Sequence, residues 1–516
     1  MRHFRHSPFC ILHSAFCIAL ALTALCVMSA GCASTPPDKD YFSVQLPYYR
    51  GMVSEARRTP EVHLGAAFGK AETNAVAGRT LSVTVRDPQG RKVLDYAGTF
   101  GDGKALAFDA PLTADAPVGE YKVKAVTTDA EGRKVRADGV FKVVPVRKGQ
   151  VFVDQDGGLI ADGKPWFPFG FYHVLVTNDV DAIADLGIDL MQTWRGYIER
   201  PGMVDRLRSR GVRVAVETAA WGQVVNNFYG RWKRKIPPVI PFETNENFRA
   251  FADLLISNPD IVAFHYTADE CGFAEIPGVK RIRDYWHALD EDHPTYLVTT
   301  RDYRMHDGAD IFGVDTYPRA FGRKRPMTDV SGLVDHVTSN TPYGQCVIAV
   351  PQGFGHSGKS NKAPHIHNES REEQFCMSYL AMVHGAKGLF WYTWWDGNDQ
   401  GAVFDAELRQ TIKQIIDEAR EFKLALLVPD AVTFRSEDGK VHARLCGDAS
   451  TGRFLITVNG SDDPSDGVFK NAALKGQKLE PLFDTPAAQP DKNGQMKVAF
   501  KGAARAVWRV APDGTR

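Results

Sequence analysis

The sequence predicts a multidomain protein in which a central (β/α)8 TIM barrel lies between two β-sandwich domains. In residues 148–428, apolar runs of strand length alternate with amphipathic helical stretches, which is typical of βα units. The regions before and after contain short strands of alternating polar and apolar residues separated by turns, which is typical of β-sandwiches. A chain of 516 residues is also too long for one hydrophobic core.

The N-terminal segment is typical of an export signal. A basic start at residues 2–6 precedes the apolar run Ile11–Val27, and Ser29–Cys32 is similar to the cleavage site of bacterial lipoproteins. This resemblance implies a signal peptide over residues 1–32, a lipid on Cys32, and an exported protein attached to the bacterial cell envelope, at the outer membrane or cell surface. An uncleaved membrane anchor is the alternative, although the run is short for a membrane span.

A β-sandwich is predicted for residues 52–147, after a polar tether at residues 33–51. Leu81–Arg86 and Tyr121–Ala125 alternate apolar and polar residues, and Asp87–Gly90 has the composition of a turn. The phrase Ala116–Val123 resembles the penultimate hairpin of immunoglobulin-like modules. This domain shows no catalytic grouping, so we interpret it as a spacer or as a wall for the barrel.

Eight apolar runs in residues 148–428 predict the eight strands of the barrel. A hairpin that begins at Val151 is expected to close one end. The predicted strands are Trp166–His173, Gly187–Trp194, Gly211–Thr218, Ile261–Glu270, Pro294–Thr300, Ala309–Tyr317, Gln345–Gly355 and Gly388–Trp395. Helices are predicted at 179–186, 245–257, 279–289, 371–384 and 405–426. Residues 429–516 return to short alternating strands and predict a small C-terminal β-sandwich.

The fourth strand ends abruptly in two carboxylates, Asp269 and Glu270. An unpaired carboxylate is too costly to bury in an apolar core, so these side chains are expected just beyond the strand. In a (β/α)8 barrel, the carboxyl ends of the strands carry the active site. The alternative is that both residues cap the following helix, whose positive end favours acidic side chains.

Several phrases of the barrel resemble the large clan of retaining glycoside hydrolases built on (β/α)8 barrels. Asp162–His173 is similar to their opening strand, and His265–Glu270 to the strand-four ending that carries the general acid/base. Ile311–Pro318 looks like strand six, and Tyr379–Tyr392 like the last βα unit. The resemblance covers about half of the chain. It implies hydrolysis of O-glycosidic bonds in a poly- or oligosaccharide, with Glu270 as general acid/base.

The sequence departs from the pattern of this clan at three positions. Asp269 stands where Asn is usual, and Cys271 where many relatives carry Pro. On strand seven, Gln352 occupies the place of the nucleophilic Glu, and a neutral amide cannot form a glycosyl-enzyme ester. Two hypotheses therefore remain open: an enzyme that uses another second carboxylate, and a carbohydrate-binding barrel that does not cut its ligand.

The second carboxylate has to come from another strand end. Asp315 is the first candidate, with Asp396 and Glu217 as the alternatives, and Asp269 either orients a neighbour or acts as the acid. A separation of about 6.5–9.5 Å between the two carboxyl groups would favour inversion, and about 5–5.5 Å would favour retention. The sequence does not choose between them.

Further polar and aromatic residues at the strand ends are candidates for binding sugar rings and hydroxyls. Packing within the barrel wall is the alternative for each of them. The set is Tyr172, His173, Trp194, Arg195, Glu217, Tyr317, Gln352 and Trp394, with Arg301 at a matching strand end.

Other partners and cofactors are not indicated. Lys+Arg and Asp+Glu number 62 each, so charge provides no argument for nucleic-acid binding. Outside the signal, the four cysteines are scattered without metal-ligand spacing, although a disulfide is possible in an exported protein. His356, His365 and His367 are interpreted as part of a mobile loop rather than a metal site. A carbohydrate and a membrane are the expected partners, and no metal or cofactor is expected.

Overall fold

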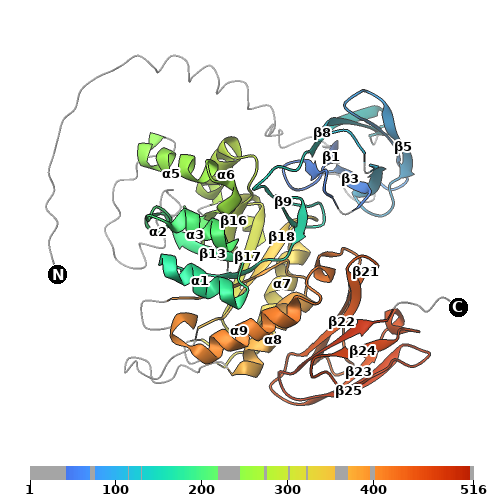
Figure 1. Ribbon diagram of the computed structural model, residues 1–516. Coiled ribbons are helices and arrows are strands. Elements are labelled where there is room, and N and C mark those ends of the chain that lie inside the picture. Colours follow the sequence, from blue (N-terminus) through green and yellow to red (C-terminus); the bar gives the residue numbers. More distant parts are fainter. Residues whose placement is uncertain are drawn as a thin grey trace, which may run out of the picture.

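The computed structural model confirms the predicted architecture of a central barrel flanked by two β-sandwiches (Figure 1). It describes residues 42–57, 59–69, 76–113, 115–129, 131–218, 244–271, 276–299, 303–320, 324–354, 370–395 and 401–511. The signal segment, Cys32, Arg301, Asp396 and the histidines at 356, 365 and 367 lie outside these residues. Within the described chain, no helix combines the length and apolar character needed to cross a membrane.

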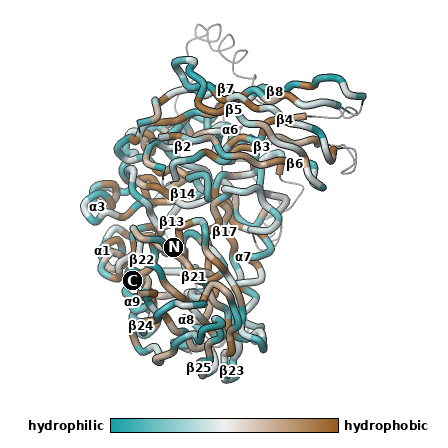
Figure 2. Tube along the Cα trace, turned by 90° about the vertical axis from the view of Figure 1, so that its right-hand side faces the viewer, coloured by the Kyte–Doolittle hydropathy of each residue, from teal (hydrophilic) through white to brown (hydrophobic). Residues whose placement is uncertain are grey.

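The N-terminal domain consists of two facing sheets. One contains β1 (Phe42–Gln45), β3 (Glu61–Phe68) and β6 (Ala105–Pro111). The other contains β2 (Met52–Ser54), β8 (Lys134–Val144), β7 (Gly119–Thr128), β4 (Thr80–Arg86) and β5 (Lys92–Thr99). In Figure 2, hydrophobic (brown) and hydrophilic (teal) residues alternate along the strands of this domain. The apolar residues of both sheets form a common core.

The domain begins earlier than the sequence predicted. Strand β1 pairs with β3 from Phe42 onward, within the segment 33–51 that was expected to be a tether. A four-residue strand with two apolar side chains is too short for its alternation to be recognised.

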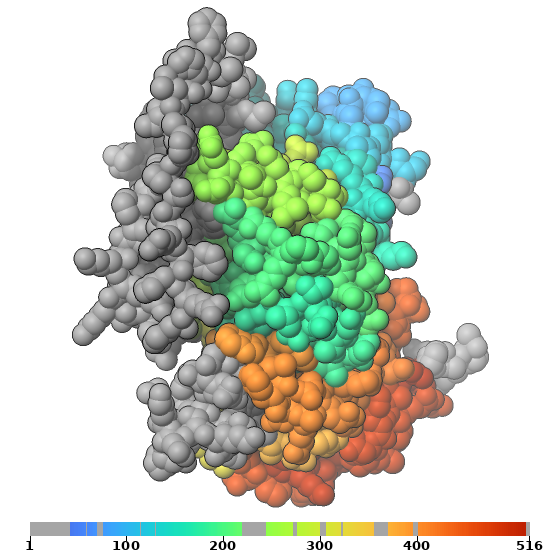
Figure 3. Space-filling view, turned by 60° about the vertical axis from the view of Figure 1, so that its left-hand side comes forward, coloured from blue at the N-terminus to red at the C-terminus, as the bar shows by residue number. Residues whose placement is uncertain are grey.

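The barrel is closed by eight parallel strands in sequence order. Each predicted strand is confirmed, with narrower bounds. They are β12 (Phe169–Phe171), β13 (Leu190–Trp194), β14 (Arg213–Glu217), β15 (Val262–Asp269), β16 (Thr295–Thr299), β17 (Ile311–Thr316), β18 (Cys346–Pro351) and β19 (Leu389–Trp391). The outer surface of the helices lies between the two sandwiches in Figure 3.

The described helices include three, α2, α3 and α7, that the sequence did not predict individually. The described α-helices are α1 (Thr177–Leu186), α2 (Arg195–Ile198), α3 (Met203–Arg210), α5 (Glu246–Ile256), α6 (Ile276–Leu289), α7 (Asp329–Asn340), α8 (Arg371–Val383) and α9 (Ala406–Ala419). Short 3-10 helices are η5 (Pro259–Ile261), η7 (Tyr303–Gly308), η8 (Ala402–Phe404), η9 (Ala425–Leu427) and η10 (Ala472–Leu474). The helix predicted at 405–426 therefore ends earlier, at Ala419.

Side chains alternate between the two faces of the barrel strands. Phe264, Tyr296 and Phe390 belong to the interior cluster, whereas Met191 and Leu297 face the helices. The interior cluster continues into the hairpin of β9 (Val151–Val153), β10 (Leu159–Ala161) and β11 (Lys164–Trp166). This hairpin fills the N-terminal end of the barrel, as the sequence predicted, so the opposite end is left for a site.

The C-terminal domain is also a two-sheet sandwich. One sheet contains β20 (Val432–Arg435), β21 (Val441–Asp448), β22 (Gly452–Asn459), β26 (Arg505–Val510) and β24 (Leu479–Leu482), and the other β23 (Ser465–Lys470) and β25 (Gln495–Phe500). The domain packs against α8 and α9, where the Arg505 guanidinium pairs with buried Glu418, which also accepts a hydrogen bond from Tyr379 at 2.7 Å.

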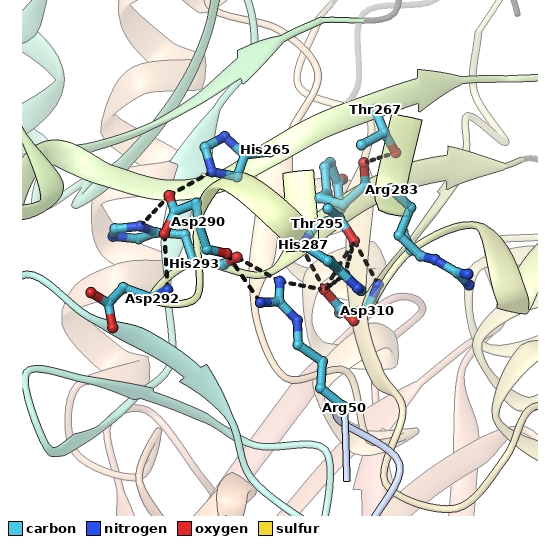
Figure 4. A network of polar contacts seen from close by, with 12 residues as sticks. Arg50, His265, Thr267, Arg283, His287, Asp290, Asp292, His293, Thr295 and Asp310 are labelled. Atoms are coloured by element: carbon cyan, nitrogen blue, oxygen red, sulfur yellow. Dashed lines mark hydrogen bonds and ion pairs between the residues drawn. The ribbon is translucent and has the colours of Figure 1, made fainter. Parts of the chain in front are cut away.

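A buried polar network ties the N-terminal domain to the barrel (Figure 4). The Arg50 guanidinium donates to the carbonyl oxygens of Asp290 and His293 at 3.1 and 2.8 Å and pairs with Asp310 at 3.3 Å. The Asp290 Oδ2 atom accepts from His265 at 2.8 Å and from His293 at 2.9 Å. Because these contacts connect strand, helix and linker backbone, we assign the network to stability.

Candidate active site

Three strands bring carboxyl groups to the C-terminal mouth of the barrel: the neighbours β14 and β15, and β17, which is separated from β15 by β16. Glu217 ends β14, Asp269 ends β15 with Glu270 directly after it, and Asp315 is the penultimate residue of β17. Beyond the effect of burial, the charge of Asp269 raises the pKa of Glu217, and the charges of Glu270 and Asp269 raise the pKa of Asp315. The four carboxyl groups therefore form one cluster. The sequence predicted all four residues as site candidates, and the barrel gathers them as expected.

Asp269 is aimed into the barrel by an irregularity in its strand. The pairing of β15 with β16 shifts register between Tyr266 and Ala268. In a regular strand, two residues that are three positions apart point to opposite faces. Here the Tyr266 hydroxyl donates to Asp269 Oδ1 at 2.7 Å, so the irregularity brings both side chains to the same face. Burial raises the pKa of Asp269 to about 6; the Tyr266 hydrogen bond opposes this rise, and the charge of Glu270 adds to it.

Glu270 is the exposed member of the cluster. Its backbone is left-handed, with φ of 43°, and its amide donates to the Val298 carbonyl oxygen at 3.0 Å. A non-glycine residue in this conformation carries strain and is frequent at functional sites. Helix α6 is described from Ile276 onward, and residues 272–275 lie outside the described chain, so helix capping stays open as the alternative.

Asp315 is buried beside Glu270. Its side chain accepts a hydrogen bond from Tyr317 at 3.2 Å through Oδ2, while Oδ1 receives no donor from the described residues. Burial raises the pKa of Asp315 well above its usual range, and the charges of Glu270 and Asp269 raise it further. Burial and these neighbouring charges therefore favour the protonated form of Asp315, next to the solvent-facing side chain of Glu270.

Glu217 is held by the second strand of the barrel. Its Oε2 atom accepts from the indole of Trp194 at 2.7 Å and from the Gln192 amide at 3.2 Å. Burial raises the pKa of Glu217 to about 8, with a further contribution from the charge of Asp269. The site thus combines protonated and ionised carboxyl groups at neutral pH, which is the condition for acid–base chemistry.

Tyrosines form the floor beneath the carboxyl groups. The hydroxyls of Tyr172 and Tyr296 are 2.7 Å apart, and the ring of Tyr266 lies 6.0 Å from Tyr172 and 5.0 Å from Tyr296. Tyr266 and Tyr296 were not predicted as site residues. The alternation of inward positions along their strands, as in Phe264 and Tyr266, is the signal that could have found them.

Aromatic residues also stand at the sides of the mouth. Tyr317 packs against Phe354 and Tyr392, with ring centroids 5.3 and 5.6 Å apart. On the other side, His173 packs on Trp194 at 4.5 Å, and its Nδ1 atom lies 3.2 Å from the Trp395 carbonyl oxygen. Burial lowers the pKa of His173 to about 4, so this imidazole is neutral at pH 7.

Three predicted binding residues occupy positions that differ from the expectation. Trp394 is only 2% exposed and packs on Phe171 in the core between barrel and helices. Arg195 begins α2, and its Nε atom donates to Glu199 at 2.6 Å. Gln352 is completely buried, and its amide bonds to the Arg319 and Phe354 backbones at 3.1 and 3.3 Å. Trp394 and Gln352 thus present no accessible surface to a ligand.

A possible metal-ligand group lies at the other end of the barrel. Among the described residues, His265, Asp290 and His293 place three ligand atoms within 4.8 Å of one another. Those atoms are already hydrogen-bonded to each other, and the His293 Nε2 atom is 3.0 Å from the Pro259 carbonyl oxygen. The three candidate ligand atoms are therefore each hydrogen-bonded without an ion, while His265 Nδ1 has no partner among the described residues.

Comparison with known proteins gives only distant structural neighbours. No protein-family model matches the chain, and no curated protein matches it. A structure from Bacteroides fragilis NCTC 9343, described provisionally as an α-galactosidase/melibiase, has 13% identity and a TM-score of 0.47, covering 92% of this chain and 98% of its own.

Two further neighbours are similar in kind. The β-glucuronidase of Parabacteroides merdae has 9% identity and a TM-score of 0.36, with 92% of this chain and 73% of that chain covered. A GH2 β-galacturonidase from Eisenbergiella tayi has 14% identity and a TM-score of 0.40, with coverages of 69% and 68%. These neighbours are glycosidases, but similarity at this level assigns no activity to the chain.

Proposed function

We propose that the protein is a glycoside hydrolase that cleaves O-glycosidic bonds of a poly- or oligosaccharide, with Glu270 as general acid/base. The observation that carries the proposal is the placement of Asp315 against Glu270 at the mouth of the barrel. We further propose that Asp315 is the second carboxyl group. Asp269, Glu217 and the aromatic residues around them would bind and orient the sugar.

The chemistry requires two carboxyl groups in different protonation states. Burial favours the protonated form of Asp315, while Glu270 faces solvent and can reach a glycosidic oxygen. Glu270 would protonate that oxygen with a proton passed from Asp315. Asp315, left as a carboxylate, would then face the developing positive charge of the sugar. Because the two groups are adjacent, we propose the shorter of the two carboxyl separations, about 5–5.5 Å, which is the arrangement of a retaining enzyme.

The second candidate function is carbohydrate binding without cleavage. Gln352 favours it, because the strand-seven position that carries the nucleophile in the resembled clan here holds a buried amide. We also propose that the protein is a lipoprotein attached through Cys32, in line with its N-terminal sequence. Loss of fatty-acid incorporation in Cys32→Ser would test that attachment.

The test is hydrolysis and binding of a polysaccharide panel by wild type, Glu270→Gln and Glu291→Gln. Glu291 is a matched control, because its side chain is exposed at the opposite end of the barrel. Cleavage by wild type and Glu291→Gln that Glu270→Gln loses would support the enzyme. Binding by all three proteins with cleavage by none would favour the non-catalytic function for the panel.

A further inference from the structure

A cavity lies between the N-terminal sandwich and the barrel. Its volume is about 790 Å³, and its walls come from β3, β6, the β9–β10 turn and the loop before β18. Those barrel segments lie at the N-terminal end of the strands, whereas the carboxyl cluster lies at the C-terminal end. Small-molecule sites commonly have volumes of about 300–1,000 Å³ and often lie at domain interfaces.

One wall of this interdomain cleft is an exposed aromatic ring held in a fixed position. Tyr343 is 66% exposed. Its hydroxyl donates to Asp156 Oδ1 at 2.6 Å, and the edge of His63 lies against the ring, with centroids 5.8 Å apart. The ring is thus anchored at its polar end while its face stays open. An immobilised ring loses little conformational entropy when a ligand stacks on it.

The Asp109 carboxylate provides hydrogen-bond acceptors in the cleft. His63 Nδ1 lies 2.5 Å from Asp109 Oδ1, and His63 Nε2 lies 3.5 Å from Asp156 Oδ1. No donor within the described chain contacts Asp109 Oδ2, and half of this side chain is exposed. Asp109 therefore has free lone pairs at the rim of the cleft, where ligand hydroxyl groups can donate to them.

The cleft is rigid because one side chain joins its two walls. Gln155, in the β9–β10 turn, donates to Thr59 and to the Glu61 carbonyl oxygen at 2.6 and 2.7 Å. Its own oxygen accepts from the His63 amide at 3.0 Å. The turn that carries Asp156 is in this way bonded to β3, so the opening exists without a ligand.

We propose that this cleft is a binding site for a neutral saccharide, separate from the barrel mouth. One sugar ring would stack on Tyr343, and vicinal hydroxyls would donate to Asp109. The Asp109 carboxylate disfavours anionic ligands, and with the neighbouring polar side chains it makes the cleft too polar for a lipid chain. Leu64 and Pro342 complete an apolar wall beside the ring. Saccharide binding in this cleft does not depend on hydrolysis at the mouth of the barrel.

The test is calorimetric titration of full-length Glu270→Gln protein, which leaves polymers uncut, with maltohexaose, cellohexaose, xylohexaose and mannohexaose. We expect one of these probes to bind, and Tyr343→Ala added to this background to weaken that binding about tenfold, the equivalent of losing one aromatic stacking contact. Asp109→Asn should weaken it less. Phe483→Ala, which removes a 43% exposed ring on the C-terminal domain, should bind like the parent.

Two results would overturn the site. One is a folded Tyr343→Ala protein that binds every probe as tightly as the parent does. The absence of binding of every probe to both proteins counts as the same result. The other is Tyr343-dependent binding of oligogalacturonate alone, because that ligand is anionic. Hydrolysis of aryl glycosides by Tyr343→Ala in the otherwise wild-type chain is measured separately. Its presence or absence bears on the proposed reaction and leaves the cleft result unaffected.

Discussion

The backbone amide of Arg319 donates to the side-chain oxygen of Gln352 at 3.1 Å. This bond joins the end of β18 to the segment that follows Asp315 and Tyr317. The Gln352 nitrogen is also used, because it donates to the Phe354 carbonyl oxygen. The strand-seven position is therefore a structural junction here, and the two carboxyl groups of the proposed reaction, Glu270 and Asp315, come from the ends of two other strands, β15 and β17.

Changing Gln352 to Glu should not create a nucleophile. The new carboxylate would be fully buried and would place an oxygen against the Phe354 carbonyl oxygen. We expect a loss of about 3 kcal/mol in the free energy of unfolding and no gain in hydrolysis. Urea unfolding and aryl-glycoside assays measure both effects. A stable Gln352→Glu protein with faster hydrolysis would contradict the structural role.

Removing Arg319 should be more damaging than removing its exposed partner. Arg319 is 1% exposed and pairs with nearly buried Glu373 at 2.8 Å and with half-exposed Asp462. Arg319→Ala removes the guanidinium that faces the buried Glu373 carboxylate and should cost about 3–5 kcal/mol, whereas Asp462→Ala should cost about 1 kcal/mol or less. Equal losses in denaturant titrations would mean that Glu373 does not depend on Arg319.

Glu217 should make stability depend on pH. Its folded pKa of about 8 lies above the unfolded value of about 4.3. Folded protein therefore holds a proton that unfolded protein has released, so this contribution is full below about pH 4.3 and is lost as pH rises through about 8. Glu217→Gln should flatten the fall in unfolding free energy over that range, and Glu291→Gln should not. Identical slopes for wild type and Glu217→Gln would contradict the shift.

Asp290 should make stability depend on pH in the direction opposite to Glu217. Burial acts to raise its pKa, but hydrogen bonds from His265 and His293 hold the pKa well below its usual range. The stabilisation is present above the unfolded pKa of about 3.9 and is lost as pH falls. Asp290→Asn should cost about 3 kcal/mol at neutral pH, and Asp292→Asn about 1 kcal/mol or less. Thermal unfolding of the two variants would show no difference if the network in Figure 4 were unimportant.

The sequence was sufficient for the barrel and for the carboxyl cluster, because both depend on short-range patterns. An apolar run that stops at Asp269 and Glu270 defines a strand and its end. The direction of the aromatic residues was harder to predict. Trp394 follows the last barrel strand, and only the fold shows that its ring is buried beside Phe171. Helix α7 was not recognised because Gly332 and several β-branched residues weaken its helical pattern.

The roles of Gln352 and Arg319 depend on contacts across many residues of sequence. Gln352 lies 33 positions from its donor Arg319, and Arg319 lies 143 positions from Asp462 in another domain. No local pattern encodes such partners. The raised pKa of Asp315 also depends on the whole fold, since it arises from burial and then from the charges of Glu270 and Asp269 at the end of a different strand.

The most direct test of the proposed pair is hydrolysis of aryl glycosides by wild type, Glu270→Gln and Asp315→Asn, with Glu291→Gln as the control. We expect wild type and the control to be active, and each of the other two variants to lose about 100-fold or more of kcat while retaining its fold. The wild-type product should keep the anomeric configuration of the substrate, as read by NMR. Full activity in folded Asp315→Asn or Glu270→Gln would contradict the assignment of that residue.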